Sequence, residues 1–184
     1  RELQGKLQGK LQGFLCHWKL QGILRARRFY STAELVGLYK AHILSYIEYR
    51  TPGIAHAAAT VLAPIDAIQA RFLREIGLSE EDALLRFKLA PLHTRRDIAM
   101  LGVIHRAALG HGPLHFRKLF PLSHWPPLGN HGRHIKDRTM EYNQEYFRRS
   151  AFGYVKVYNS LSPEDVEPGD VKRFQRLSLI HISE

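Results

Sequence analysis

Histidine pairs are the first residues in this chain whose types and spacing could do chemistry. His111 and His115 are four residues apart, and His131 and His134 are three apart, so each pair could bring two imidazoles near one metal ion. Glycine interrupts both pairs, however, and proline also interrupts the first. The single cysteine, Cys16, cannot supply the cysteine set of a zinc site. The sequence therefore predicts no metal site.

The carboxylates do not form a catalytic cluster either. Two-metal catalysis needs grouped acids, because they hold the ions that stabilise the attacking and leaving oxygens. The chain has no Asp-Asp pair, and its acidic runs are Glu80 to Asp82 and Glu164-Asp165. Both runs fall where helices are expected to begin, and the helix dipole favours acids there. With no glycine-rich phosphate loop and no nucleophile elbow, we expect no catalytic residue and no cofactor.

The basic residues could bind an acidic partner. The net charge is +10, and nucleic acid is the commonest acidic partner of such a protein. Arg71 and Arg74, three residues apart, are expected to share a helix face. The same holds for Arg95 and Arg106, which are three helical turns apart. The alternative is that these residues pair with nearby acids on a solvated surface. The candidate phosphate-binding residues are Lys40, Arg71, Arg74, Arg95, Arg96 and Arg106.

The positive charge is concentrated at the start of the chain. Residues 1–28 carry seven Lys or Arg and a single Glu, which is more than half of the net charge. Leu-Gln-Gly recurs there at Leu3, Leu7, Leu11 and Leu20. Each glycine costs a helix about 1 kcal/mol relative to alanine. We therefore expect residues 1–28 to be a repetitive, poorly ordered extension, and its native origin stays open.

Helical periodicity dominates the segment of the chain that carries the candidate basic residues. Ser31 and Glu34 match the capping box of a helix start, and the helix is expected to end at Pro52-Gly53. Tyr39 and Tyr46 fall on its apolar stripe, so we expect both in the core rather than stacked on bases. Further helices are expected from Thr60, as the cap, to Gly77, from Ser79 to Phe87, from about Thr94 to Gly110, and from Pro113 to Phe120.

A second helical part is expected after a break rich in proline and glycine over residues 121–132. One helix is predicted over residues 150–161, and Asp170 is expected to cap another that runs to Phe174. No stretch alternates with period two. The predicted fold is therefore all-α, with an irregular helical bundle over residues 29–120 and a smaller helical segment over residues 133–176.

Composition supports a folded protein that does not contact a membrane. Hydrophobic residues make up 45% of the chain, enough for a core. No apolar run approaches the roughly 20 residues of a membrane helix, and the N-terminus lacks the apolar stretch of a signal peptide. One cysteine allows no intramolecular disulfide. We expect a soluble intracellular protein.

Several motifs occur in a recognisable order. Leu38-Tyr39-Lys40 is followed by Ile47-Glu48-Tyr49, and Leu62 to Arg71 reads Leu-x-x-aliphatic-Asp-x-aliphatic-Gln-x-Arg. This order resembles the segment after the polymerase core in reverse transcriptases of non-long-terminal-repeat retrotransposons. The resemblance covers about residues 27–176, with Tyr158 where that family usually has Trp. The later matching stretches are Leu89-Ala-Pro-Leu92, Arg95-Arg96-Asp97, Gly110 to Pro121, Arg148 to Phe152, and Val157 to Leu161.

The resemblance implies a fragment of an RNA-directed DNA polymerase, namely its thumb and the helices that follow. Its partners would be an RNA–DNA hybrid and the missing fingers and palm, where the family's carboxylates bind Mg²⁺, and the parent would act in the nucleus. Residues 177–184 resemble the translated end of a sequencing adapter, so we expect a non-native tail. Two alternatives remain at this point, a free-standing helical module that contacts proteins and a translated relic without function.

Overall fold

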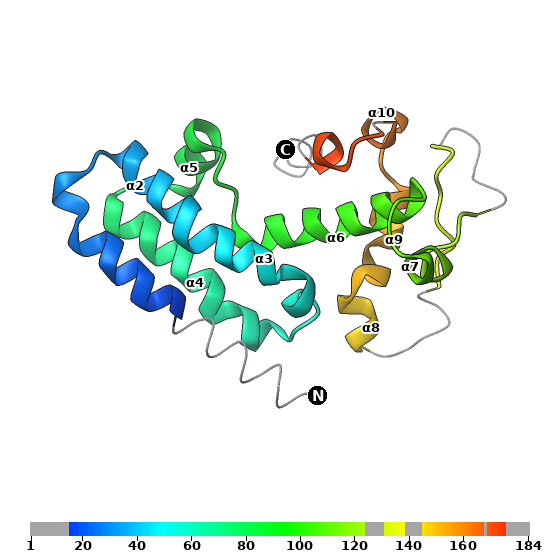
Figure 1. Cartoon of the computed structure of the whole chain (residues 1–184), viewed down its shortest axis with the longest axis horizontal. Coiled ribbons are helices and arrows are strands. Elements are labelled where there is room, and N and C mark those ends of the chain that lie inside the picture. The colour runs from blue at the N-terminus through cyan, green and yellow to red at the C-terminus, as the bar shows by residue number, and fades with distance from the viewer. Residues whose placement is uncertain (1–14, 124–130, 139–144, 168, 176–184) are drawn as a thin grey trace. The chain divides into compact units, whose positions relative to one another are not determined.

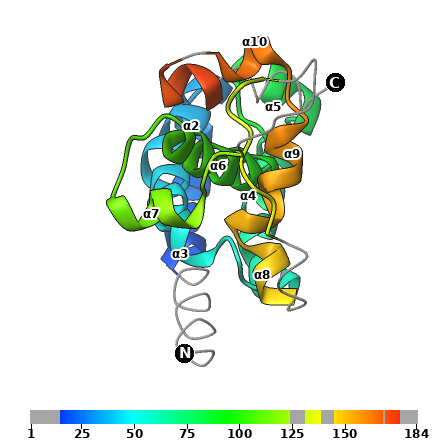
Figure 2. The ribbon, with the colours of Figure 1, turned by 90° about the vertical axis from the view of Figure 1, so that its right-hand side faces the viewer.

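The computed structural model describes residues 15–123, 131–138, 145–167 and 169–175. The fold is all-α, as predicted, with short connections between helices. The chain divides into two compact units, residues 1–95 and residues 96–184, which are described separately below. Figures 1 and 2 show the ribbon of both units from two directions.

The first unit is built from helices that share one apolar core. Residues 15–25 form its first helix. The labelled elements are η1 (Arg27–Phe29), α2 (Thr32–Tyr39), η2 (Lys40–Leu44), α3 (Ser45–Ile54), α4 (Ala59–Ile76) and α5 (Glu80–Phe87). Because α2, η2 and α3 follow one another without a break, they form a single long helix with a π-helical turn in its middle.

The predicted capping box starts this long helix. The Glu34 carboxylate accepts from the Ser31 backbone N–H at 2.8 Å, and the Ser31 hydroxyl accepts in turn from the Glu34 N–H at 3.4 Å. These bonds satisfy donors that a helix start otherwise leaves free. The bonds that the Glu34 carboxylate accepts lower its pKa, with the backbone bond as the larger cause. The helix continues through Pro52-Gly53 and ends at Ile54, slightly beyond the predicted end.

At helices α4 and α5, one predicted boundary is wrong and three are confirmed. Ala58 precedes α4 without a side-chain cap, so the prediction that Thr60 would cap this helix is wrong. Gly77 ends α4 as expected, at φ 68°, a left-handed conformation that glycine adopts without steric cost. The Ser79 hydroxyl caps α5 by accepting from the Asp82 N–H at 3.0 Å. Helix α5 ends at Phe87, as predicted, and Lys88 follows it in a left-handed conformation, at φ 53°.

An aromatic stack lies at the centre of the first core. The rings of Tyr39 and Phe72 lie 4.4 Å apart and nearly parallel, and both side chains are fully buried. Burial is the largest cause that raises the pKa of the Tyr39 hydroxyl. Tyr39 is therefore a core residue, as predicted. Tyr46 is only half-buried at the edge of the same core.

The helix at residues 15–25 corrects the prediction that residues 1–28 form a poorly ordered extension. Cys16, Leu20, Ile23 and Leu24 are buried in the first core. Their spacing follows one helix face, and burying apolar side chains contributes about 1.5–3 kcal/mol each, more than the cost of Gly22. The repeats at Leu3, Leu7 and Leu11 lie outside the described residues.

The second unit starts within α6 (Leu92–Ala108). Its other helices are α7 (Leu114–Leu119), α8 (Glu145–Arg149), η4 (Ala151–Tyr154), α9 (Val155–Asn159), α10 (Pro163–Val166) and residues 171–175. The sequence predicts a boundary between the two parts near residue 120. The boundary lies after Arg95 instead, because Leu101, Ile104 and Phe120 pack in one core with Tyr158 and Phe174.

The predicted linker over residues 121–132 is partly wrong as well. Leu122 and Ile135 form an isolated antiparallel bridge, in which the Ser123 N–H donates to the His134 carbonyl at 2.7 Å. The Asn159 side chain bonds both backbone groups of Ile135, at 3.0 and 2.8 Å. His131 and Ile135 are buried, so this segment belongs to the second core. Residues 124–130, with the proline pair, and the expected tail at 177–184 lie outside the described residues.

Candidate nucleic-acid interface

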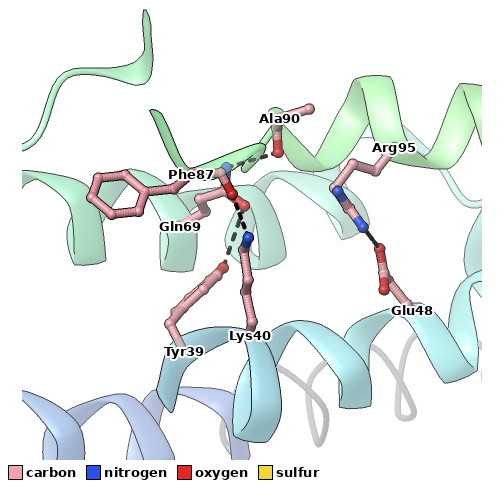
Figure 3. Close-up of polar contacts among 7 residues, drawn as sticks. All are labelled: Tyr39, Lys40, Glu48, Gln69, Phe87, Ala90 and Arg95. Carbon is pink, nitrogen blue, oxygen red and sulfur yellow. Dashed lines mark hydrogen bonds and ion pairs between the residues drawn. The ribbon is translucent and has the colours of Figure 1, made fainter. Parts of the chain in front are cut away.

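Lys40 is half-buried where the long helix passes the end of α5. Its ammonium group donates to the backbone carbonyl of Phe87 (Figure 3). Burial lowers the pKa of the Lys40 ammonium, and the positive charges of Arg95 and Lys88 lower it further. The charges of Arg95 and Lys88 thus act on Lys40, and the Lys40 contact with Phe87 brings its ammonium to the residue that precedes Lys88. We call Lys40, Lys88 and Arg95 the Lys40 cluster.

Arg95 lies in the first turn of α6 and pairs with an acid from α3. Its Nε donates to the Glu48 carboxylate at 2.6 Å, and a terminal guanidinium nitrogen contacts the same oxygen (Figure 3). The side chain of Arg95 is 25% exposed and that of Glu48 is 41% exposed. Solvent therefore reaches the ion pair, and an anion in solution can compete with Glu48 for the guanidinium.

Lys88 supplies the most accessible charge of the cluster. Its side chain is exposed, and its left-handed backbone places it directly after α5. Lys88 was not among the residues predicted from the sequence. The signal that could have indicated it is its place directly after the predicted helix end at Phe87 and directly before the motif Leu89-Ala-Pro-Leu92. The cluster carries three cations and one paired acid, so it attracts anions such as phosphates.

Two linked hydrogen bonds connect the long helix, α4 and the segment that follows α5. The Tyr39 hydroxyl donates to the Gln69 side-chain oxygen at 3.4 Å, and the Gln69 amide nitrogen donates to the Ala90 carbonyl at 3.0 Å (Figure 3). Gln69 is buried, so both bonds are made away from water. They tie the long helix and α4 to the segment that carries Lys88.

Arg71 and Arg74 do not join the Lys40 cluster. Arg71 faces the helix at residues 15–25, where its guanidinium lies 3.1 Å from a ring nitrogen of His17 and beside the Gln21 side-chain amide. Arg74 is exposed on α4. Their neighbour Glu75 pairs with Arg27 at 2.6 Å. Arg71 therefore acts in packing, while Arg74 remains an accessible cation.

Arg96 and Arg106 belong to the second unit. Arg96 is buried, so its guanidinium is poorly placed to meet a phosphate in solution. Arg106 is exposed on α6. The six residues predicted from the sequence thus separate into three pairs. Two belong to the Lys40 cluster, two are exposed cations and two are held within the protein: Lys40 and Arg95, Arg74 and Arg106, and Arg71 and Arg96, respectively.

In the histidine pair of the second unit, the His131 ring is bonded to the backbone. The rings of His131 and His134 lie 4.7 Å apart. His131 Nε2 lies 3.0 Å from the Tyr158 carbonyl and donates to it, and the other ring nitrogen accepts from the Arg133 N–H. Burial is the largest cause that lowers the pKa of His131. A neutral imidazole with both nitrogens used in this way has no lone pair free for a metal.

Metal binding and membrane spanning each require a particular arrangement of residues. In the part of the chain that the structure describes, no group of three or more His, Cys, Asp or Glu side chains is arranged to hold a metal ion. Within the same residues, none of the helices combines the length and apolarity needed to span a membrane.

Comparison of the sequence with protein-family models, with curated proteins and with solved structures finds no match.

Proposed function

We propose that this chain is a thumb-like fragment of a retrotransposon RNA-directed DNA polymerase, and that its first unit holds template–primer nucleic acid. The observation that carries the proposal is the Lys40 cluster, in which Lys40 contacts the end of α5 beside Lys88 and Arg95 of α6 pairs with Glu48 of α3. An RNA–DNA hybrid presents a regular row of phosphates to such a group. Binding of this kind follows backbone shape and is not sequence-specific.

The motifs that suggested the family also contact one another in the first unit. Tyr39 and Lys40 come from the first motif, Glu48 from the second, and Gln69 from the third. Tyr39 bonds Gln69, while Glu48 pairs with Arg95 of a later matching stretch. These motif residues thus position the cluster, a role that suits a rigid support for nucleic acid. Catalysis would belong to the palm and its Mg²⁺, since this sequence has no Asp-Asp pair.

A salt-dependent binding measurement tests the proposal. The chain is titrated with a blunt RNA–DNA hybrid at several salt concentrations, and Lys88→Gln is compared with the unchanged protein. Removing one phosphate-binding charge lowers the slope of log K against log salt by about 1. We expect Lys88→Gln and Arg95→Gln each to weaken binding and to reduce the slope in this way.

Arg74→Gln is the matched control, because it removes the same charge from an exposed position outside the cluster. We expect it to change affinity by less than about twofold, as a distant charge screened by salt acts weakly. Equal losses in Lys88→Gln and Arg74→Gln would show a generally basic surface and would contradict the proposal. Folded protein that binds no hybrid would favour a protein-interaction module instead.

A further inference from the structure

A separate hollow of about 490 Å³ lies in the first unit, between the helix at residues 15–25 and the long helix that begins with α2. Aromatic and basic side chains line it together. Its lining residues include Trp18, Lys19, Arg25, Tyr30 and His42. None of them belongs to the Lys40 cluster.

The aromatic side chains of this hollow face solvent. Trp18 is 71% exposed and Tyr30 is 44% exposed. Cys16 and Leu20, on the other face of the same helix, are fully buried. The helix therefore fills the core without Trp18, which contributes little to folding. A large exposed aromatic surface of this kind is typical of a binding site.

The charge around the hollow selects the kind of ligand. The Lys19 ammonium donates to the His42 carbonyl at 3.2 Å and lies 4.6 Å from the centre of the Tyr46 ring, so it is held in place. Arg25 lines the hollow and is exposed. Among the described lining residues there is no Asp or Glu. The hollow thus offers flat aromatic surfaces beside two positive charges, that of Lys19, which is held in place, and that of Arg25, which is exposed.

We infer that this hollow binds unpaired nucleotides of single-stranded nucleic acid. A base would stack on Trp18 or Tyr30, and the phosphates beside it would meet Arg25 and Lys19. The volume lies within the range of small-ligand pockets and accommodates a base with its sugar. This inference rests on the proposed function, because it adds a single-strand subsite to a module that holds template and primer. A paired duplex cannot use it, since its bases are already stacked.

Intrinsic fluorescence makes this subsite directly observable. The chain has two tryptophans, Trp18 and Trp125, so the full-length Trp125→Phe protein reports on Trp18 alone. It is titrated with oligo(dT) of about 8 nucleotides, a length typical for one binding domain of this kind. Stacking of a thymine on Trp18 is expected to quench its emission. In parallel, labelled oligo(dT) and labelled RNA–DNA hybrid are titrated with the Trp18→Ala and Trp18→Phe variants.

We expect Trp18→Ala to weaken oligo(dT) binding by about 10-fold, the loss of one stacked base, and to leave hybrid affinity unchanged. Trp18→Phe keeps an aromatic face and is expected to restore most of the affinity. The inference is overturned if Trp18→Ala binds oligo(dT) as the unchanged protein does, if emission stays constant while the labelled strand saturates, or if both ligands lose affinity equally.

The two proposals fail in different ways. If Lys88→Gln leaves hybrid binding unchanged while oligo(dT) binding depends on Trp18, the proposed duplex-holding function fails and the single-strand subsite stands. If Lys88→Gln weakens hybrid binding while Trp18→Ala changes nothing, the function stands and the subsite is overturned. Circular dichroism of each variant verifies that the helices remain folded.

Discussion

The Arg95 Nε donates to the Glu48 carboxylate at 2.6 Å, although 47 residues separate the two in the sequence. This ion pair joins α3 to the first turn of α6 within the first unit (Figure 3). It also places an acid beside the cations that we propose to bind phosphate. Glu48 therefore both positions Arg95 and competes with nucleic acid for it.

Glu48→Gln tests this competition. The variant removes the negative charge but keeps a side chain of similar shape, so Arg95 becomes available to a phosphate. We expect hybrid affinity to rise by a few-fold, because the acid that competes for Arg95 is gone. Stability is expected to fall by no more than about 1 kcal/mol, since the pair is partly exposed. Glu81→Gln, an exposed acid on α5, is the control for net charge. An equal rise in both variants would contradict a specific competition.

Tyr39 is predicted to be the strongest single determinant of stability in the first core. Tyr39→Ala removes a fully buried ring that stacks on Phe72, and such truncations cost about 3–5 kcal/mol. Tyr39→Phe removes only the bond to Gln69 and is expected to cost about 1 kcal/mol. Tyr46→Ala is expected to cost less than Tyr39→Ala, because Tyr46 is half-buried. Urea unfolding followed by circular dichroism measures all three, and a smaller loss in Tyr39→Ala than in Tyr46→Ala would show that the core is misassigned.

Local signals were the part of the fold that the sequence could predict. The Ser31 capping box, the Ser79 cap and the Gly77 helix end all depend on interactions within a few residues, and all three are confirmed. The helix at residues 15–25 was missed because Gly22 and the repeat lowered its local helix propensity. Its buried face is decided by packing against distant helices, and this tertiary contribution outweighs the local cost.

The candidate site was harder to predict than the fold. The sequence indicated Lys40 and Arg95, but Lys88 joins them only because α5 ends beside the long helix. Ion pairs such as Arg27 with Glu75 span 48 residues, and spacing along the chain does not select such partners. The domain boundary was misplaced for the same reason, because the division falls inside one helix, α6, and no loop marks it.

The second unit is predicted to lose stability in mild acid. Burial lowers the pKa of His131 in the folded state, while an unfolded histidine binds a proton near pH 6.5. The unfolded state therefore takes up more protons than the folded state as the pH falls below about 6.5. The contribution of His131 to the free energy of unfolding is fully present above that pH and decreases below it. Urea unfolding of the second unit at a series of pH values measures this slope.

His131→Leu removes the titrating group and is expected to flatten the pH dependence, even though the lost hydrogen bonds lower stability at every pH. His115→Gln is the control, since His115 is exposed on α7. A slope that remains in His131→Leu and disappears in His115→Gln would show that another histidine is responsible.

Gly153 is predicted to be the glycine that the second unit tolerates least when replaced. A Cβ at this position would lie 1.8 Å from the Arg148 carbonyl oxygen, so Gly153→Ala forces α8 and η4 apart. We expect a loss of about 1–3 kcal/mol, as for other overpacked sites. At Gly132 a Cβ meets no atom within 4 Å, so Gly132→Ala is the matched control. Hydrogen exchange is expected to show reduced protection around Val155 and Tyr158 in Gly153→Ala, with protection around Tyr39 unchanged. Equal protection in the two glycine variants would mean that Arg148 and Gly153 do not make this close approach.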